Sequence, residues 1–509
     1  MPATRPTDLQ QWQYVLPRGG WVDVSFPLAG GEGGEGILTT LYNMRVTRDG
    51  LETVPGWSTA LTNNVDVNAA GNFVGVVPVQ DISNEVYNFF FFTKKIYMWR
   101  SGQSSWTDVT PSGWTGDVIS EVPEVVLFNN KFYMAIPHAG LGGVYELDPQ
   151  ATSPQWTLIT NSPKAKTIAN LGFRLVVGYL VKSSTEVYPY RIQWSGLNNP
   201  TQWDDMQTLD LPTYDAIMKF APLREHVVVI TPQRFFILAY TGNPLTPFAV
   251  QFVTTLPGTL TNKEAVLSVG THDVHMLFYA LGSGLYAFTG NESVLLSGNI
   301  DLSWKWQGVG NIVARLGYNP AESEIYVIFD RSAINAPPLC FVYQLLYRTW
   351  YQRDVGGLFF TITHSYKNVV GAFVDWTSPT LKARPLKLGM VIDQRRDDQS
   401  FNATIELPVS EIGPTGSQKT LTSVLLWWTT VGNVAGITGQ WKIGLAVSHH
   451  FVQLTSPDQF GYTIVGSLPV NGVMEEVSVH YTGRYLRLKL DAENLSTRIV
   501  FHGVFVFWH

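Results

Sequence analysis

Acidic residues with catalytic potential occur in this chain as sequence neighbours. The carboxylate pairs are Asp204–Asp205, Asp397–Asp398 and Glu475–Glu476. Glycoside hydrolysis needs two carboxyl groups that face each other across the scissile bond, about 5–10 Å apart. Neighbouring residues of a strand point to opposite faces, so adjacency argues against that geometry. The pairs therefore do not predict a glycosidase site.

Nucleophilic and metal-ligating residues give no stronger signal. Ser195 lies in a WSG turn and lacks the G-x-S-x-G pattern of a hydrolase. Cys340, the single cysteine, lies in the strand-like PPLCFVYQ and is interpreted as a small buried residue. His449 and His450 are adjacent on a strand, where both cannot easily bind one metal ion. We expect no catalytic residue, no metal and no cofactor.

A glycine-rich segment, GEGGEG at 31–36, formally matches the G-x-G-x-x-G fingerprint. That fingerprint is informative only between a buried strand and a helix N-terminus, where backbone amides hold a pyrophosphate. The residues that follow, ILTTLYN, are strand-like, and no βαβ unit surrounds them. We interpret 31–36 as a loop, and Glu32 and Glu35 as candidate channel or interface residues.

The composition indicates a folded all-β protein. Hydrophobic residues make up 45% of the 509 residues and charged residues only 15%, which favours folding over disorder. Aromatic residues reach 13%, with 45 Gly and 29 Pro, as expected for many short strands joined by turns. The net charge of −6, without a basic block, argues against tight electrostatic capture of nucleic acid.

A repeat organises most of the chain. Units of four short strands each end near an aromatic or apolar residue, at intervals of 45 to 54 residues. These closing residues are Trp106, Trp156, Trp203, Phe248, Leu296 and Trp350. Turn residues inside the units predict hairpins at Asn129–Asn130, Pro232–Gln233 and Gly282–Gly284. This period and strand number are typical of β-propeller blades.

Six blades are the preferred count, with seven as the alternative. The segment 359–376 is either a seventh partial blade or the strand that closes the ring with the N-terminal segment. Closure is required because an open ring would leave a sheet edge unpaired.

Four regions are expected, and they differ in charge and in the length and alternation of their strands. After the propeller comes the most charged stretch of the chain, and then longer strands with clean alternation, which predict a β-sandwich. The regions are an N-terminal arm with closure strands at 1–58, the propeller at 59–380, a charged linker at 381–400 and the β-sandwich at 401–509. In the linker, further candidate channel or interface residues are Arg395, Arg396, Asp397 and Asp398.

One motif resembles a known family. RIQWSGLNNPTQWD, at 191–204, is similar to the R-x-x-W-S-x-x-x-x-P-x-x-W signature of propeller hub proteins from short-tailed bacteriophages. These are the packaged-DNA stabilisation proteins and the tail nozzle proteins of the tail tubular protein B type. The stretches ILTTLYNMRVTRDGLETVPGW and GRYLRLKL…FHGVFVFW also resemble the opening and closing strands of that family.

The resemblance implies a structural protein of the virion tail, assembled in the host cytoplasm. Such proteins form a ring, usually of six subunits, that contacts the portal adaptor protein and docks tail fibres or a needle. Double-stranded DNA would pass through without sequence recognition and be retained before infection. The conduit is expected between subunits, because the hole of one propeller disc is too narrow for a duplex.

Two other functions remain open from the sequence. The first is a phage receptor- or glycan-binding propeller, and the second is a polysaccharide-cleaving propeller enzyme. The first residues, MPATRPTDLQQWQYVLP, lack the apolar region of a signal peptide. No apolar run approaches the roughly 18 residues of a transmembrane helix, so no membrane-spanning segment is expected.

Overall fold

The computed structural model describes most of the chain. The described residues are 10–15, 40–47, 50–54, 57–59, 65–66, 70–83, 85–100, 103, 105–270, 275–298, 313–319, 322–330, 339–353, 358–365, 368–375, 382–388, 401–406, 410–411, 419–431, 440–448, 463–469, 474–495 and 498–508. This part is built almost entirely from β-strands, as the composition predicts.

Six propeller sheets are antiparallel meanders of four consecutive strands. The first two contain β7 (Phe73–Gln80), β8 (Val86–Phe92), β9 (Ile96–Arg100) and β10 (Thr107–Asp108), then β11 (Val125–Phe128), β12 (Lys131–Ile136), β13 (Gly143–Leu147) and β14 (Thr157–Leu158). The next two contain β15 (Ala165–Leu171), β16 (Arg174–Val181), β17 (Val187–Gly196) and β18 (Asn199–Asp210), then β19 (Lys219–Leu223), β20 (His226–Ile230), β21 (Arg234–Tyr240) and β22 (Phe248–Thr255). The short 3-10 helix η1 (Lys263–Ala265) leads into β23 (Val266–Gly270), β24 (His275–Leu281), β25 (Gly284–Phe288) and β26 (Ser293–Leu295), and the sixth blade contains β27 (Val313–Asn319), β28 (Glu324–Asp330), β29 (Leu339–Gln344) and β30 (Thr349–Arg353).

A seventh sheet draws strands from two distant parts of the chain. Its consecutive strands are β31 (Leu358–Ser365), β32 (Asn368–Asp375) and β33 (Lys382–Leu388). β33 then pairs with two N-terminal strands, β5 (Trp57–Thr59) and β6 (Val65–Asp66). The N-terminal segment therefore supplies the outer position of this sheet.

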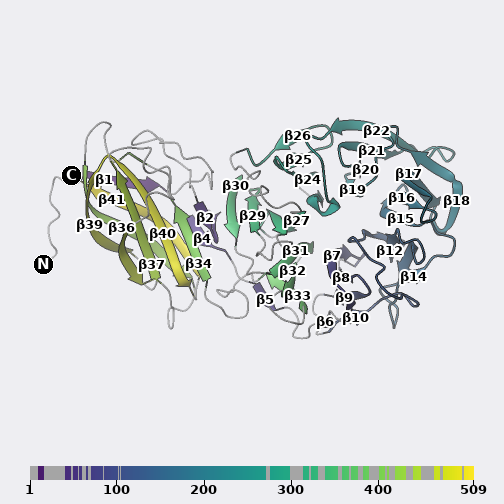
Figure 1. Ribbon diagram of the computed structural model, residues 1–509, viewed down its shortest axis with the longest axis horizontal. Helices are drawn as coiled ribbons and strands as arrows, with labels where there is room; N and C mark the ends of the chain where they lie inside the picture. The colour runs from purple at the N-terminus through teal and green to yellow at the C-terminus, as the bar shows by residue number, and fades with distance from the viewer. Residues whose placement is uncertain are drawn as a thin grey trace.

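The seven sheets close into a ring. The first strands of successive sheets contact one another in the order β7, β11, β15, β19, β23, β27 and β31, and β31 contacts β7 (Figure 1). The fold is a β-propeller of seven blades. The preferred count of six is thus wrong and the alternative of seven is right. The seventh blade was hidden because its outer strand lies some three hundred residues away in the sequence, outside any local repeat.

The repeat itself is confirmed. The fourth strand of each of the first six blades begins at, or within a few residues of, the predicted closing residue. The three predicted hairpins join β11 to β12, β20 to β21 and β24 to β25. Asn129 and Asn130 both have positive φ angles, 45° and 63°, as a two-residue hairpin turn requires.

The segment predicted as a charged linker begins with a strand. Residues 382–388 form β33 of the seventh blade, so the propeller extends beyond residue 380. A strand was missed here because its Lys and Arg residues raised the local charge without breaking the backbone pairing. Residues 389–400 lie outside the described residues.

The C-terminal region is a β-sandwich. One sheet contains β36 (Lys419–Val431), β39 (Met474–Gly483) and β41 (Arg498–Trp508), joined by β1 (Gln10–Val15) and the hairpin of β3 (Met44–Thr47) and β4 (Gly50–Thr53). The other contains β34 (Phe401–Glu406), β35 (Ser410–Glu411), β37 (Gln440–Ser448), β38 (Thr463–Pro469) and β40 (Tyr485–Leu495). Trp441 stacks obliquely on Trp428 and Phe501, with ring centroids 6.1 and 5.6 Å apart. All three are fully buried between the sheets.

Alternation along β40 is confirmed with one difference. Leu486, Leu488 and Leu490 are buried, in agreement with the alternation expected of the sandwich strands. Arg487 on the other face is also buried, because it forms an ion pair with Glu406 at 2.6 Å.

A short N-terminal strand joins the propeller to the sandwich. β2 (Thr40–Tyr42) pairs in parallel with β30 and antiparallel with β34. The sixth blade and one sandwich sheet therefore form one continuous sheet of ten strands. β2 therefore links the two lobes through backbone hydrogen bonds.

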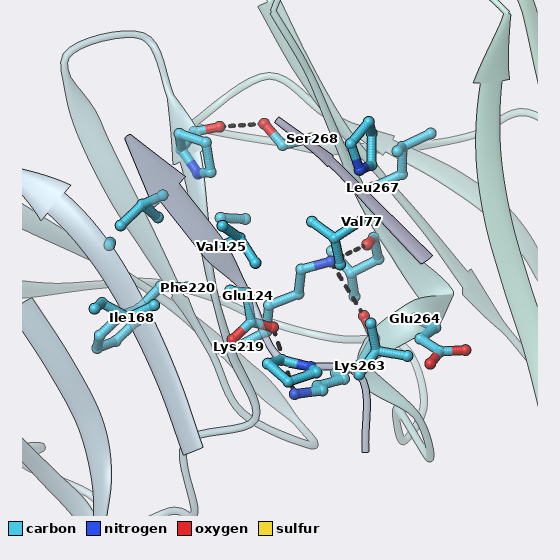
Figure 2. A pocket seen from close by; sticks show the side chains of 18 of the residues that line it. Val77, Glu124, Val125, Ile168, Lys219, Phe220, Lys263, Glu264, Leu267 and Ser268 are labelled. Atoms are coloured by element: carbon cyan, nitrogen blue, oxygen red, sulfur yellow. Dashed lines mark hydrogen bonds and ion pairs between the residues drawn. The ribbon is translucent and has the colours of Figure 1, made fainter. Parts of the chain in front are cut away.

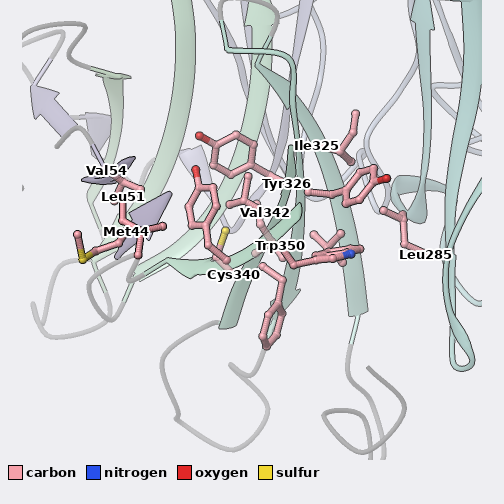
Figure 3. Close-up of a cluster of buried hydrophobic side chains, with 14 of the residues drawn as sticks. Met44, Leu51, Val54, Leu285, Ile325, Tyr326, Cys340, Val342 and Trp350 are labelled. Carbon is pink, nitrogen blue, oxygen red and sulfur yellow. The ribbon is translucent and has the colours of Figure 1, made fainter. Parts of the chain in front are cut away.

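The same junction is filled by a shared hydrophobic core. Met44, Leu51 and Val54 of the β3–β4 hairpin belong to the same buried cluster as Ile325 and Val342 of the sixth blade (Figure 3). This cluster continues into the sandwich and into the fourth and fifth blades.

Replacing Asn43 by alanine is expected to destabilise the junction by about 2 kcal/mol. Asn43 is buried with a φ of 59°, a conformation that disfavours residues with a Cβ other than Asn and Asp. Its side-chain amide donates to the Asn402 carbonyl at 2.7 Å, and its backbone N–H donates to the Gln352 carbonyl at 2.7 Å. Alanine loses the first of these hydrogen bonds and strains the backbone.

Urea denaturation measures this cost, and Asn43→Gly separates its two parts. Glycine tolerates the φ angle, so Asn43→Gly should retain only the cost of the lost side-chain bond. Equal stability of Asn43→Ala and the unmodified protein would contradict the proposed stabilising role of Asn43 at the junction.

Candidate functional site

A cavity lies at the centre of the propeller. Its volume is about 470 Å³, and the first strands of six successive blades line it, from β7 to β27. Apolar walls come from residues such as Val77, Val125, Ile168 and Leu267 (Figure 2). Ionisable side chains from four blades also face it: Glu124, Lys219, Lys263, Glu264 and Arg315.

Blade topology gathers the charged groups at one end of this cavity. Lys219 begins β19, Glu124 directly precedes β11, and Lys263 and Glu264 lie in η1 directly before β23. First strands run in the same direction around a propeller, so their starting residues meet on one face. Asn262 caps η1 by accepting a hydrogen bond from the Glu264 N–H at 3.1 Å, which fixes the turn.

Lys219 is held by backbone carbonyls. Its Nζ donates to the carbonyl of Val266 at 2.7 Å and to that of Lys263 at 3.4 Å. Burial lowers the pKa of Lys219 from its ordinary value, while Glu124 opposes this effect and the nearby Lys263 adds to it. An amine in such surroundings is more easily deprotonated than a surface lysine.

A network of ion pairs surrounds Lys263, whose side chain is almost completely buried. Lys263 Nζ lies 3.6 Å from Glu124 Oε1 and 3.9 Å from Glu121 Oε2. Glu121 in turn pairs with Lys166 Nζ at 2.9 Å. The remaining Glu124 oxygen, Oε2, is buried and has no hydrogen-bond partner.

Glu264 and Arg315 form the other ion pair of the cavity. Burial raises the pKa of Glu264, and the positive charges of Arg315, Lys263 and Lys219 counteract the increase. The two ion pairs and Lys219 together place both signs of charge against an apolar wall.

Chemically, this arrangement is suited to binding a small molecule. Within the described ranges, no group of three or more His, Cys, Asp or Glu side chains could hold a metal ion. Small-molecule sites are typically mostly apolar with a few placed polar groups. The cavity is therefore the candidate functional site.

The residues predicted from the sequence do not form this site. Glu32, Glu35, Arg395, Arg396, Asp397 and Asp398 lie outside the described residues. The cavity residues were missed because each stands alone in its own blade. Aligning the repeats would have shown an ionisable residue at or beside the start of several first strands.

The other chemically suggestive residues are structural or exposed. Cys340 is fully buried in β29, as predicted. Asp204 and Asp205 are both exposed on β18. Glu476 accepts a hydrogen bond from Ser423, and His449 and His450 are outside the described residues.

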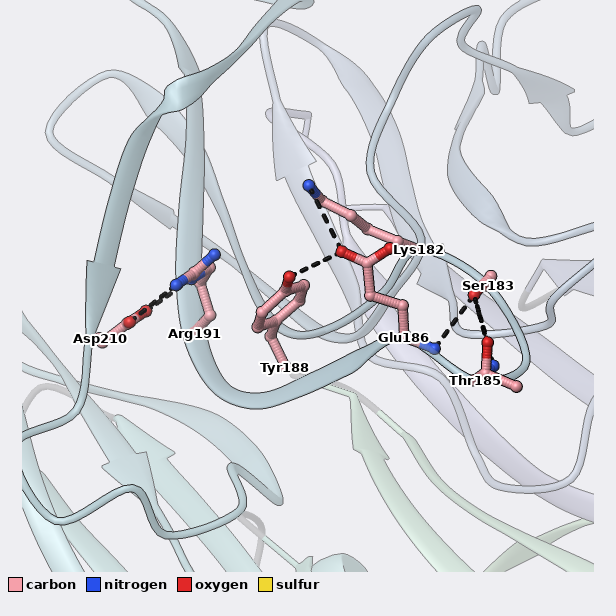
Figure 4. Close-up of polar contacts among 7 residues, drawn as sticks. All are labelled: Lys182, Ser183, Thr185, Glu186, Tyr188, Arg191 and Asp210. Carbon is pink, nitrogen blue, oxygen red and sulfur yellow. Dashed lines mark hydrogen bonds and ion pairs between the residues drawn. The ribbon is translucent and has the colours of Figure 1, made fainter.

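The family-like motif is a packing motif of the third blade. Arg191 forms a two-pronged ion pair with Asp210, Nε to Oδ1 at 2.6 Å and an Nη to Oδ2 at 2.8 Å. Its guanidinium also lies over the Tyr188 ring, 4.3 Å from the centroid (Figure 4). Ser195 Oγ accepts the Leu175 N–H at 3.0 Å, so this hydroxyl supports the sheet.

The two tryptophans of the motif have different surroundings. Trp194 is buried against Phe248 of the next blade, with ring centroids 5.2 Å apart. Trp203 is partly buried, and its indole N–H donates to the Pro200 carbonyl at 2.8 Å. The motif thus stabilises the third blade and packs it against the fourth blade.

The fold defines an all-β protein with a seven-bladed propeller and a β-sandwich. No protein-family model and no curated protein matches the chain. One solved structure similar to it is the extracellular domain of the proposed hybrid two-component system BT4673 from B. thetaiotaomicron, with 10% identity and a TM-score of 0.38, covering 72% of this chain and 42% of that chain. Another, described as the extracellular domain of a one-component system BT4673, has 9% identity and a TM-score of 0.40, covering 88% of this chain and 63% of that chain.

This chain therefore spans less than two thirds of the length of either structure. Likeness at this level carries no inference about function. In the described part of the chain, no helix is long and apolar enough to cross a membrane.

Replacing Lys219 by methionine is expected to stabilise the protein at neutral pH, and the gain should shrink as the pH rises. A lysine whose pKa is lowered on folding binds its proton more weakly in the folded state. Its unfavourable contribution is therefore present at low pH and disappears as the pH approaches the unfolded value of 10.5.

Urea denaturation near neutral pH and near pH 10 measures the difference between Lys219→Met and the unmodified protein. Lys182→Met, on the surface of the third blade, should show no such pH dependence. A constant difference at both pH values would contradict the argument.

Proposed function

We propose that this protein is a structural subunit of a short-tailed phage tail, the hub or nozzle that extends the portal–adaptor channel. The observation that carries the proposal is the agreement between motif and fold. The motif at 191–204 resembles propeller hub proteins, and it lies inside a blade of a propeller that is followed by a sandwich.

A mechanical role fits the way in which the lobes are joined. The ten-stranded sheet and the shared core connect the propeller to the sandwich. Rotational repetition of a rigid subunit makes heterologous contacts that close into a ring. The cavity of about 470 Å³ inside one propeller is far smaller than a DNA duplex requires, which favours a conduit between subunits.

Exposed apolar side chains offer a surface for the neighbouring subunit. Phe173, Leu197 and Leu245 are 66%, 54% and 88% exposed at the turns of the third and fourth blades. In an antiparallel meander these turns lie on the same face of the disc, and the Asn198 N–H bonds to the Phe173 carbonyl at 2.8 Å. Apolar tips of this kind are typical of contact surfaces when they gather on one face.

The proposal includes partners and a location. The ring of six subunits would contact the portal adaptor and tail fibres or a needle in the virion, after assembly in the host cytoplasm. Double-stranded DNA would pass transiently, without sequence recognition. Glu32, Glu35 and the run Arg395–Asp398 remain predicted channel or interface residues.

Native mass spectrometry and negative-stain microscopy of the full chain test the ring. We expect closed rings, alone or with the adaptor protein of a short-tailed phage. A double variant, Phe173→Glu with Leu245→Glu, should weaken assembly, whereas the matched exposed change Met206→Glu on β18 should not. A monomer under all these conditions would overturn the proposal.

The two alternatives give different results in separate assays. A glycan-binding propeller would retain ligands on a glycan array, and an enzyme would turn over polysaccharide. In the described part of the sandwich, Trp427 is 38% exposed and lies against His502, with no cluster of exposed tryptophans around it. This surface does not favour the glycan alternative.

A further inference from the structure

The central cavity has the size and lining of a small-molecule site. Its volume of about 470 Å³ falls within the usual range for such sites, and it is lined by the inner strands of the propeller. The apolar wall contains Val77, Val125 and Ile168, and the charged groups gather at one end (Figure 2). An occupant would therefore need one polar end and one apolar body.

Lys219 supplies a donor for that polar end. An ammonium group has three N–H donors, and Lys219 uses two on the carbonyls of Val266 and Lys263. Among the described residues no carboxylate lies within 4.0 Å of its Nζ, whereas Lys263 and Arg315 each have a carboxylate partner. Lys219 is thus the cation of the cavity without a matching anion.

The charge balance of the lining agrees with this. Among the described lining residues, three cations, Lys219, Lys263 and Arg315, face two carboxylates, Glu124 and Glu264. One negative charge on an occupant would balance these described charges. Burial and the nearby Lys263 lower the pKa of Lys219, Glu124 and Glu264 oppose this, and an anion beside the amine would raise the pKa again.

Glu124 favours an occupant that also carries a hydrogen-bond donor. Its Oε2 is buried without a hydrogen-bond partner, while Oε1 faces Lys263. A buried carboxylate oxygen left without a donor is unfavourable, so an occupant that carries a donor would satisfy it.

We propose that the central cavity binds a small hydroxycarboxylate with an apolar body. The carboxylate accepts a hydrogen bond from Lys219, the hydroxyl donates to Glu124 Oε2, and the apolar body packs against Val77, Val125 and Ile168. This site is independent of ring formation, because all of its residues lie inside one propeller.

Calorimetric titration of the full chain with three matched probes tests the class of ligand. Mandelate carries all three features, phenylacetate lacks the hydroxyl, and phenylacetamide lacks the charge. We expect mandelate to bind about fivefold more tightly than phenylacetate, and phenylacetate about tenfold more tightly than phenylacetamide. Equal binding of all three, or no binding of any at millimolar concentration, would overturn the proposal.

Variants assign the contacts. Lys219→Met should weaken mandelate about tenfold or more and leave phenylacetamide within about twofold, because only the anion loses its partner. Glu124→Met should remove the preference for mandelate over phenylacetate. Lys182→Met on the blade surface should change neither, and a change there would contradict a site at the cavity.

The pH dependence of binding gives a second readout. Mandelate should bind more weakly as the pH rises and Lys219 loses its proton, and Lys219→Met should not show this loss. The probe series on the unmodified protein still tests the class of ligand if a cavity variant does not fold. The same pH dependence in Lys219→Met would refute the role of this lysine.

Discussion

Replacing Glu324 by alanine is expected to lower the free energy of unfolding by about 3–5 kcal/mol, because it removes one partner from a buried charge network. Glu324 is buried in β28 and accepts hydrogen bonds from the hydroxyls of Tyr326 and Tyr351, both at 3.0 Å. Its Oε1 also lies 3.6 Å from an Nη of Arg45, in the hairpin that leads to the sandwich. Alanine would remove the buried carboxylate partner of Arg45 in this blade and the acceptor of both tyrosine hydroxyls, leaving Arg45 with Glu322 and Glu52.

Glu322→Ala is the matched control for this prediction. Glu322 pairs with the same Arg45 at 3.0 Å, but its side chain is 37% exposed. Water can replace an exposed partner, so this change should cost about 1 kcal/mol or less. Urea denaturation compares the two variants, and equal losses would show that burial of the network is unimportant.

Burial raises the pKa of Glu324, and Arg45 opposes this increase. A carboxyl group whose pKa is raised on folding binds its proton more tightly in the folded state, so its contribution to stability falls as the pH rises. Stability of the unmodified protein relative to Glu324→Gln should therefore decrease from acidic toward neutral pH. A difference that increases over that range would contradict the effect of burial.

Trp156→Ala is expected to cost about 3–5 kcal/mol, as for other large aromatic residues removed from a core. Trp156 is 1% exposed and packs on Phe89 of the first blade, with ring centroids 5.3 Å apart. Its backbone N–H donates to the Val109 carbonyl at 3.1 Å. The side chain thus fills the space between the first and second blades.

Trp203→Ala measures how much a tryptophan near the end of a four-stranded unit contributes to the free energy of unfolding when it lies outside such a core. The Trp203 side chain is only partly buried, at the outer strand of the third blade. We expect a loss of about 1–2 kcal/mol, from less buried area and one hydrogen bond. The two variants compared by urea denaturation should differ clearly, and similar losses would contradict the interblade role of Trp156.

Prediction from the sequence worked where the signal was local. Strand–turn–strand units repeat within about fifty residues, and the closing residues from Trp106 to Trp350 mark their ends. Asn129 and Asn130 predicted their hairpin because both residues tolerate positive φ angles. Burial of Cys340 and the leucine face of β40 also followed from short patterns.

Pairing of the N-terminal segment with the end of the propeller was expected, but the individual strands that pair over long distances were not predicted. β5 completes the seventh blade, and β2 joins β30 to β34. These strands have three residues each, too few to show a period. The candidate site was not predicted either, since Lys219, Glu124 and Glu264 each look like an ordinary charged residue until the repeats are aligned.

The sequence by itself determined the all-β class, the four-stranded unit and the place where most units end, because turn residues and alternation act over a few neighbours. Only the tertiary structure decided that there are seven blades, that both lobes share a sheet, and that charges gather around a central cavity. Ring closure brings together residues from different blades, and the shared sheet depends on β2, whose partner strands lie far away in the sequence.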